Sequence, residues 1–423
     1  MSRFDPVDVV HVDLADGRPP ALAGRAWAVL WHGDLALGHA ELTPDDVASE
    51  ARFARVAAGA ILESVASRRF PAGYAPAAPN RFPPPAPEAP PLAELLAAAA
   101  PLAAVARGGP ARAPDTEHAS VIVCTRGRPE DLARCLAALA RGRGRPGEVL
   151  VVDNDPADPR TRAVVERAHA VTYVPEPRPG LSAARNAGIR AASGDVIAFV
   201  DDDTVVHERW LEALLAGFDG PRVLAVTGGV LPAELRTRAQ VVFERRMGHA
   251  SRGHARIAYD AAFFEPQVAY GVPVWAIGAG ANMAFRREAF DRVGLFDERL
   301  GAGATGCSED SELWYRLLAA GYECRYEPDS VVLHHHRAGM DDLRRQAYAY
   351  LKGHVAALYV QYARHGHRGN LRRIALTLPG FLIERTVEEL LAPPGERTGL
   401  LGAEVRGFLA GVGLWRLARG GAL

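Results

Sequence analysis

Three adjacent carboxylates stand out among the residues of this chain that could do chemistry. They are Asp201, Asp202 and Asp203, and they follow the apolar run Val196–Val200. Adjacent carboxylates repel one another, so such a cluster is costly unless a cation neutralises it. Oxygen ligands suit Mg²⁺ or Mn²⁺, which also bind diphosphate oxygens. The triplet therefore indicates a divalent-cation site; the alternative is a group of solvated, helix-capping acids.

A second acidic group, Glu309 and Asp310, follows a glycine-rich loop in the segment FDERLGAGATGCSEDSELWYRLLAAGY. We expect a helix to begin here with Ser308 as its N-cap and to end at Gly321. The helix dipole keeps carboxylates of the first turn ionised, as a proton acceptor must be before it acts. The segment predicts either a general base or plain capping acids.

Three weaker signals accompany these acids. Asp153 ends the run LVVD, where a carboxylate can bind a nucleobase or ribose or simply form a turn. Arg185 lies in an expected helix, where it can bind a diphosphate, hold Asp202 or make an ordinary ion pair. The run His334–His336 ends another expected strand, whose alternation places its first and third members on one face. One of these histidines could complete a metal site held by aspartate, or the run could simply occupy space at the surface or in the core.

The elements that must position these residues begin at Ala119. From there, apolar runs of strand length alternate with amphipathic helical segments, which predicts a Rossmann-like α/β domain with a largely parallel sheet covered on both faces. Open sheets of this kind bind ligands at the carboxyl ends of their strands. We therefore expect Thr125, Asp153 and Asp201–Asp203 to meet at one edge of the sheet.

The chain divides into four parts by composition. We expect a small α/β module over residues 1–70, a Pro- and Ala-rich linker over 71–115, the catalytic domain over 116–340 and a helical region over 341–423 that is interrupted at Pro379-Gly380. The last part holds twelve Lys or Arg residues against seven Asp or Glu residues. Such a tail can lie on an anionic membrane surface, or it can be a solvated helical cap.

Composition excludes several classes of protein. The 423 residues carry a formal net charge of -1, which argues against a dedicated nucleic-acid binder. Lys352 is the only lysine, and no phosphate-binding P-loop motif is present. Four cysteines without paired spacing indicate reduced thiols. We expect no secretory signal and no spanning helix, hence a cytoplasmic protein with at most peripheral membrane contact.

In their order along the chain, these motifs resemble glycosyltransferase family 2, which has the GT-A fold, over about residues 119–339. The segments that carry the resemblance are SVIVCTRGRPEDL, the strand ending at Asp153, GLSAARNAG, FVDDD, GAGANMAFRREAF, FDERLGAG, SEDSELWYR and VVLHHHR. The resemblance implies a hexosyltransferase-type enzyme. Such an enzyme moves a sugar, with inversion, from a UDP-, GDP- or dTDP-linked donor to a hydroxyl of a glycan, lipid-linked or small-molecule acceptor, and it uses Mg²⁺ or Mn²⁺.

The resemblance also implies a role for each matching residue. Nucleotide-sugar contacts are Thr125 and Asp153 at the base and ribose, Arg185 and Asp202 at the nucleotide, and Asn282 in the loop that lines the sugar pocket. Metal ligands are Asp201, Asp203 and His334, and the catalytic pair is Asp310 as base with Glu309 as its neighbour. The segment CTRG departs from the family's frequent Pro-Thr-Tyr-Asn, so Arg126 cannot stack on the base as a tyrosine would.

Other classes of protein fit the residues less well. Asp201 and Asp203 match the loose nucleophile motif of haloacid-dehalogenase-type phosphatases, but Lys352 has no acidic partner nearby in the sequence. A nucleotidyltransferase would need a lysine-containing loop that Cys124–Pro129 does not offer. A processive synthase would add spanning helices. A catalytically inactive nucleotide-sugar or carbohydrate-binding protein is the remaining alternative.

Overall fold

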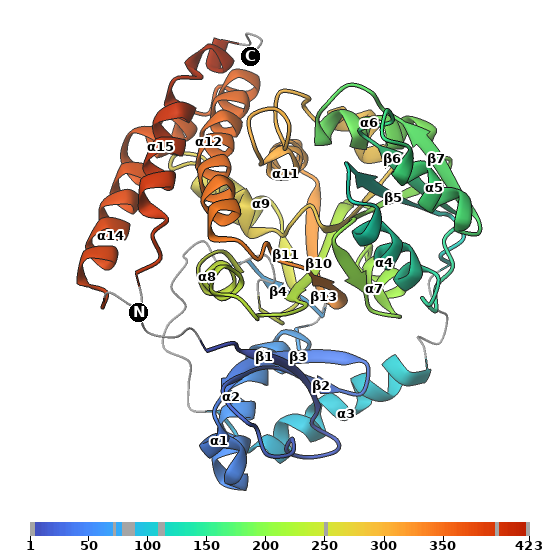
Figure 1. Cartoon of the computed structure of the whole chain (residues 1–423), viewed down its shortest axis with the longest axis vertical. Coiled ribbons are helices and arrows are strands. Elements are labelled where there is room, and N and C mark those ends of the chain that lie inside the picture. Colours follow the sequence, from blue (N-terminus) through green and yellow to red (C-terminus); the bar gives the residue numbers. More distant parts are fainter. Residues whose placement is uncertain are drawn as a thin grey trace.

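The computed structural model describes residues 5–70, 73–77, 89–108, 115–248, 253–393 and 397–419. Figure 1 shows three parts: an N-terminal module, a domain built on one large sheet, and helices of the C-terminal region along the side of that domain. Much of the predicted linker over 71–115 lies outside the described residues. The domain boundaries therefore stay a prediction.

The N-terminal module is a three-stranded sheet backed by helices. Its strands are β1 (Asp8–Asp13), β2 (Ala26–His32) and β3 (Leu35–Leu42); β1 runs parallel to β2, and β3 runs antiparallel to it. Its helices are α1 (Pro44–Ala48), α2 (Glu50–Ser67) and α3 (Leu92–Gly108). The sheet and the helices share one apolar core, to which α3 contributes buried Leu95 and Ala99. Helix α3, which falls within the predicted linker, therefore packs with the N-terminal module.

The large sheet has ten strands in the order β4-β11-β13-β10-β12-β8-β5-β6-β7, with β9 paired to β13. Strands β8, β5, β6 and β7 are parallel to their neighbours in that group, and β12 is inserted antiparallel between β8 and β10. The prediction of a mostly parallel central sheet is confirmed. The strands are β4 (Ala75–Pro76), β5 (Ala119–Thr125), β6 (Glu148–Asp153), β7 (Val171–Pro175), β8 (Val196–Asp201), β9 (Thr204–Val206), β10 (Val223–Pro232), β11 (Ile257–Tyr259), β12 (Asn282–Arg286) and β13 (Glu323–His334).

Helices cover both faces of this sheet, as continuous apolar strands require. Alternate residues of β5 belong to two separate cores, with Ile122 in one and Val121 and Val123 in the other. Gly188 lets one helix lie directly on the sheet, because a Cβ there would come within 2.7 Å of the Ile122 side chain. The helices are α4 (Pro129–Leu139), α5 (Pro159–Arg167), α6 (Leu181–Ala191), α7 (Trp210–Ala216), α8 (Arg238–Met247), α9 (Ala261–Phe264), α10 (Glu288–Val293) and α11 (Glu309–Ala319).

The C-terminal region is helical, as predicted. It contains α12 (Met340–His365), α13 (Gly369–Arg372), α14 (Leu378–Leu391), α15 (Leu401–Val412) and a 3₁₀ turn over Trp415–Arg419. The expected interruption at Pro379-Gly380 is wrong. A π-helical turn over Arg373–Thr377 joins α13 to α14 without a gap, and the wider turn accommodates a proline that lacks the N–H of a regular helix. Within the described ranges, no helix is both long and apolar enough to cross a membrane.

Candidate active site

The predicted strand ends meet at one edge of the large sheet. Thr125 lies opposite Asp153 in the pairing of β5 with β6, and Cys124 lies opposite Asp201 in the pairing of β5 with β8. Asp202 and Asp203 follow in the turn between β8 and β9. The three aspartates therefore stand beside Thr125, as the strand pattern predicted.

Asp202 is buried and bound by two side chains. The Thr125 hydroxyl donates to its Oδ2 at 2.7 Å, and Arg128 Nη1 donates to its Oδ1 at 3.1 Å. Burial raises the pKa of Asp202 to about 7, with the nearby charge of Asp203 adding to the effect and Arg128 opposing it. Asp202 thus keeps a fixed orientation beside β5.

The two carboxylate oxygens of Asp203 have different neighbours. Arg128 Nη1 donates to Oδ2 at 2.8 Å. Oδ1 lies 3.1 Å from His334 Nε2, but it is buried without a hydrogen bond from the described residues. Burial pushes the pKa of Asp203 upward, but the charges of His334 and Arg128 outweigh it and hold the pKa well below its ordinary value. Asp203 is therefore an ionised carboxylate, and its Oδ1 faces the imidazole of His334.

Asp201 is the least restrained of the three aspartates. Its side chain is 35 % exposed, and the nearest cation is Arg185 Nη2, at 3.6 Å from Oδ1. Burial is the main cause that raises the pKa of Asp201 above its ordinary value. Asp201 and Asp203 together leave carboxylate oxygens available to a ligand.

These free oxygens fit a cation that completes its shell with other ligands. No three His, Cys, Asp or Glu side chains in the described part of the chain are arranged to hold a metal by themselves. Mg²⁺, however, is commonly held by one or two carboxylates together with substrate phosphates and water. The residues at the sheet edge fit that pattern, and the bare Oδ1 of Asp203 is the observation that favours it.

His334 belongs to a polar chain that runs away from the aspartates. Its Nδ1 lies 3.2 Å from His336 Nδ1, and His336 Nε2 lies 2.8 Å from Glu244 Oε2. The contact confirms that the first and third histidines share a face. Burial lowers the pKa of His334, but Asp203 reverses this and raises it above its ordinary value. A protonated imidazole cannot bind a metal, so the role of His334 as a ligand stays a prediction.

Arg185 connects the sheet edge to the second acidic group. It extends from α6, its side chain is only 2 % exposed, and Nη1 donates to Glu309 Oε1 at 2.6 Å. Nη2 donates to the Gly280 carbonyl at 3.2 Å and lies 3.6 Å from Asp201. Burial raises the pKa of Glu309 to about 7 even though Arg185 opposes the shift. One buried cation therefore holds the end of β8, the 280 loop and the start of α11 together.

Asp310 is fixed by backbone groups at the start of α11. Gly280 N–H donates to its Oδ2 at 2.8 Å, and Ser311 N–H donates to its Oδ1 at 2.6 Å. Ser308 takes the N-cap position of this helix, as predicted, but not with the geometry of a side-chain cap. Ser308 has φ 72° and ψ 18°, in the left-handed region, and its side chain makes no capping bond. The predicted helix end is confirmed, because Gly321 (φ +82°) follows the last turn.

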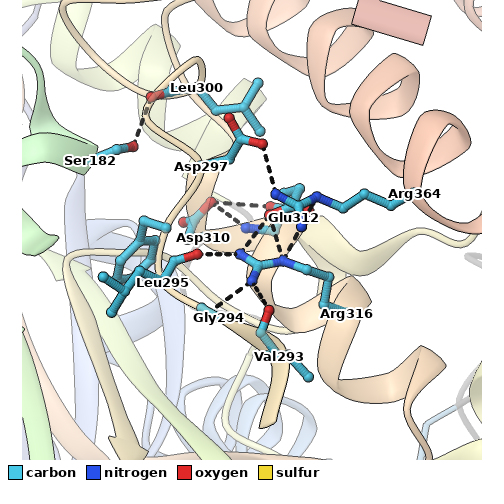
Figure 2. Close-up of polar contacts among 12 residues, drawn as sticks. Ser182, Val293, Gly294, Leu295, Asp297, Leu300, Asp310, Glu312, Arg316 and Arg364 are labelled. Carbon is cyan, nitrogen blue, oxygen red and sulfur yellow. Dashed lines mark hydrogen bonds and ion pairs between the residues drawn. The ribbon is translucent and has the colours of Figure 1, made fainter. Parts of the chain in front are cut away.

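A buried ion network lies beneath Asp310 (Figure 2). Glu312 is completely buried, and Arg316 binds it with Nε at 2.9 Å and Nη2 at 2.8 Å. Arg316 also donates to the three consecutive carbonyls of 293–295. Arg364, from α12, contacts Glu312 at 3.3 Å and donates to Asp297 at 3.0 Å. The network fixes α11 against both the preceding loop and the C-terminal region.

Comparisons with known proteins agree with this geometry. Residues 120–294 match the family model described as glycosyl transferase family 2. The chain is 30% identical over 279 residues to the N-acetylglucosaminyl-diphospho-decaprenol L-rhamnosyltransferase of Mycobacterium tuberculosis, and the match covers 59% of this chain and 86% of that protein. The chain belongs to glycosyltransferase family 2. The GT-A fold predicted for its central domain is likewise confirmed.

Two further similarities were found for this family 2 protein. It is 30% identical over 264 residues to a pre-mycofactocin glycosyltransferase of Mycobacterium tuberculosis; the match covers 62% of this chain and 51% of that relative, so the chain spans about half its length. A solved structure, the mannosyltransferase PcManGT from Pyrobaculum calidifontis in complex with GDP-Man and Mn²⁺, has 19% identity and a TM-score of 0.47. That match covers 70% of this chain and 87% of the solved one.

Two predicted contacts of the family 2 site are occupied by the protein itself. Asn282 is fully buried: its amide nitrogen donates to the carbonyls of Gly229 and Ser330, and its oxygen accepts from Trp210 Nε1. It therefore supports the loop that precedes β12 from the protein interior and presents no exposed group to a ligand. Asp153 is also fully buried, and both of its oxygens accept hydrogen bonds, one from Tyr173 and one from a backbone N–H.

Sequence motifs do not single out Arg128, which contacts two of the aspartates at the sheet edge. Arg128 stands just before α4 and bridges Asp202 and Asp203 with one nitrogen, while its side chain remains 37 % exposed. The signal was available, because Arg128 follows the strand end at Thr125 by three residues in CTRGRP. The family resemblance points to Arg126 instead, because Arg126 occupies the position of the family's tyrosine.

Proposed function

We propose that this chain transfers a sugar, with inversion, from a nucleotide diphosphate to an acceptor hydroxyl. The observation that carries the proposal is the position of Arg185, whose guanidinium lies within 3.6 Å of Asp201 and within 2.6 Å of Glu309. A donor bound at the sheet edge would therefore lie next to the acidic start of α11. The donor and a proton acceptor must lie this close together, because the acceptor hydroxyl loses its proton as it attacks the donor.

The donor's nucleotide would bind along the carboxyl ends of β5, β6 and β8. We assign Thr125 and Asp153 to the base and ribose, although Asp153 must exchange its bond from Tyr173 to reach a ligand. Arg128 is a partly exposed cation of the loop after β5 that contacts Asp203, and it suits the diphosphate. Asp202 would hold Arg128 in position through its own contact at 3.1 Å.

Asp201 and Asp203 would hold Mg²⁺ or Mn²⁺, with His334 in reserve as a third ligand if it loses its proton. A bound divalent cation supplies charge that stabilises the departing nucleotide diphosphate. The chain prepares for this by keeping Asp203 ionised, through its contacts with Arg128 and His334. Asp201 adds a second, partly exposed carboxylate on the same edge.

Asp310 would take the proton of the acceptor hydroxyl while that oxygen attacks the anomeric carbon from the face opposite the leaving group. One displacement of this kind inverts the anomeric configuration. Backbone N–H groups of Gly280 and Ser311 orient the carboxylate. Glu309 would keep Arg185 in place rather than act on the substrate.

The acceptor class is suggested by the relatives' names. They include a decaprenol-linked rhamnosyltransferase, a succinoglycan biosynthesis protein and an O-antigen biosynthesis protein. We propose that this chain also glycosylates a cell-envelope glycan or a lipid-linked acceptor. The base and the sugar of the donor are left to experiment.

Donor binding and transfer can be tested together. UDP-, GDP- and dTDP-sugars are screened with Mn²⁺ by thermal shift, since a ligand of the folded state raises the melting temperature. The donor that binds is then assayed for transfer, and the anomeric configuration of the product is read by NMR. A retained configuration would contradict the single displacement. Stabilisation by a nucleotide sugar with no transfer or hydrolysis of any donor would favour the catalytically inactive binding protein.

A further inference from the structure

Exposed apolar side chains are concentrated in the C-terminal helices. Nine large hydrophobic side chains are exposed among the described residues, and seven of them lie between residues 376 and 415. The seven are Leu376, Ile383, Val387, Leu390, Leu391, Leu409 and Trp415. Scattered exposed leucines need no explanation, but a cluster confined to one short segment marks a surface that meets something apolar.

Helix α14 has two apolar faces, and the protein covers only one of them. Leu378, Leu382 and Arg385 are buried against the rest of the chain at helical spacing. Ile383, Val387 and Leu390 follow the same spacing on the opposite side, with exposed fractions of 66%, 49% and 68%. Figure 1 shows α14 and α15 side by side at the outer margin of the molecule, so this second face points away from the sheet.

The C-terminal helices carry an excess of unpaired positive charge. Its acidic residues are mostly engaged: Glu388 pairs with Arg246 and Arg385, Glu404 lies 3.7 Å from Arg385, and Glu389 accepts bonds from the 398–399 turn. In contrast, five exposed arginines have no acidic partner among the described residues. They are Arg368, Arg372, Arg406, Arg416 and Arg419.

The arginines stand next to the exposed apolar side chains. Arg406 precedes Leu409 by one turn on α15, and Arg419 stacks over the Trp415 ring at 4.6 Å. Arg372 lies at the start of the helical run that leads into α14. An interfacial helix has this composition, with apolar side chains that enter the acyl boundary and arginines that reach the headgroups.

We propose that the outer surface of α14 and α15 docks on an anionic lipid surface. The unpaired arginines favour lipid over a second copy of this chain, because two copies would bring like charges together. Docking here would place α12 and α11, and with them the acidic start of α11, on the lipid side of the domain. The surface itself is independent of the proposed function, since its chemistry is read from exposed side chains of the C-terminal helices, outside the proposed active site.

The test uses the full chain and vesicle flotation without any donor or acceptor. We expect the wild-type chain to float with vesicles of phosphatidylcholine and phosphatidylglycerol, and to float poorly with phosphatidylcholine alone. The variant Ile383→Ser/Leu390→Ser should bind the anionic vesicles at least about tenfold more weakly. Phe70→Ser is the matched control, because Phe70 is exposed on the N-terminal module and should not contribute.

The electrostatic part has its own variant. Arg406→Ala/Arg416→Ala should weaken binding to anionic vesicles about tenfold, whereas Arg55→Ala, an exposed arginine of α2, should leave it unchanged. Equal binding to neutral and anionic vesicles, or wild-type binding by the Ile383→Ser/Leu390→Ser variant, would overturn the proposal. So would a wild-type dimer in sedimentation velocity that this variant converts to a monomer, with no flotation by either protein.

Discussion

The two acidic groups of the site are restrained in opposite ways. At the sheet edge, the aspartates are held by other side chains, and Asp203 Oδ1 has no hydrogen bond from the described residues. At the start of α11, Asp310 is held by backbone N–H groups and Glu309 by a buried arginine. The first arrangement can exchange partners when a ligand arrives, and the second keeps its direction. A site for binding and a site for proton transfer have these different requirements.

Metal removal should have the largest effect and act only on the sheet edge. We expect excess EDTA to abolish transfer, because the free oxygens of Asp201 and Asp203 would lose their cation. Added Mn²⁺ should restore activity. The melting temperature of the donor-free chain should hardly change, since the ion network under α11 does not include these aspartates. Full activity in EDTA would mean that the aspartates at the sheet edge do not act through a cation. The proposed difference between the two acidic groups would then be wrong.

Asp310→Asn should reduce kcat by roughly 10³-fold, because the amide cannot accept the acceptor's proton. Donor affinity, measured by calorimetry, should stay near that of the wild type, since the donor contacts the sheet edge. Asp291→Asn, at an exposed position of α10, is the control that should keep full activity. Near-native turnover by the Asp310 variant would assign the base elsewhere.

Two arginines allow a matched test of the ion network under α11. Arg316 and Arg292 each pair with a glutamate four residues earlier, but the Arg316 pair is buried and the Arg292 pair is exposed. Arg316→Met should lower the free energy of unfolding by about 3 kcal/mol or more, because it leaves three carbonyls without their donor and the buried Glu312 with Arg364 alone. Arg292→Met should cost less than about 1 kcal/mol. Urea unfolding measures both, and equal losses would mean that the network contributes little.

Arg128→Gln should weaken donor binding by about tenfold, because the loop after β5 loses the cation we assign to the diphosphate. Its unfolding should change less than that of Arg316→Met, since Arg128 is partly exposed. Arg141→Gln, at an exposed position, is the control. Unchanged donor affinity in the Arg128 variant would mean that Arg128 neutralises Asp202 and Asp203 but does not contact the donor.

The smallest expected effect is a pH dependence that both groups share. Burial raises the pKa of Glu309 from 4.5, and that of Asp202 from 3.8, to about 7 in each case. The native state therefore keeps these protons where the unfolded chain has lost them, so stability falls as pH rises from about 4 through 7. Metal-free thermal melts should show a loss of roughly a few degrees. Glu309→Gln and Asp202→Asn should each flatten the curve, and an unaltered slope in both would contradict the assignment.

Local patterns in the sequence predicted most of the sheet edge. Thr125, Asp153 and Asp201 each follow an apolar strand, and strand ends are set by residues that lie next to one another in the chain. The left-handed backbone of Ser308 could not be predicted in this way. Three glycines with positive φ, Gly301, Gly303 and Gly306, bring the chain into α11 from a direction that local capping rules do not anticipate.

The remaining errors depend on contacts between distant segments. Asn282 looked like a loop residue, but β12 enters the sheet between β8 and β10, and this buries its side chain. Arg128 reaches Asp202 and Asp203 across more than seventy positions of the chain. Pro379 was expected to interrupt a helix, and only the π-turn that precedes it explains why it does not. These features belong to the tertiary structure and leave little trace in a short window of sequence.

The reach of Arg364 into the network under α11 also bears on how small an active fragment could be. Arg364 is close to the last residue of α12, yet it contacts Glu312 and Asp297 within the sheet domain. A truncation that kept only the family-matched segment and its strands would strip a counter-charge from a fully buried glutamate. The shortest folded catalytic unit should therefore extend through α12, well past the end of the recognisable family motif.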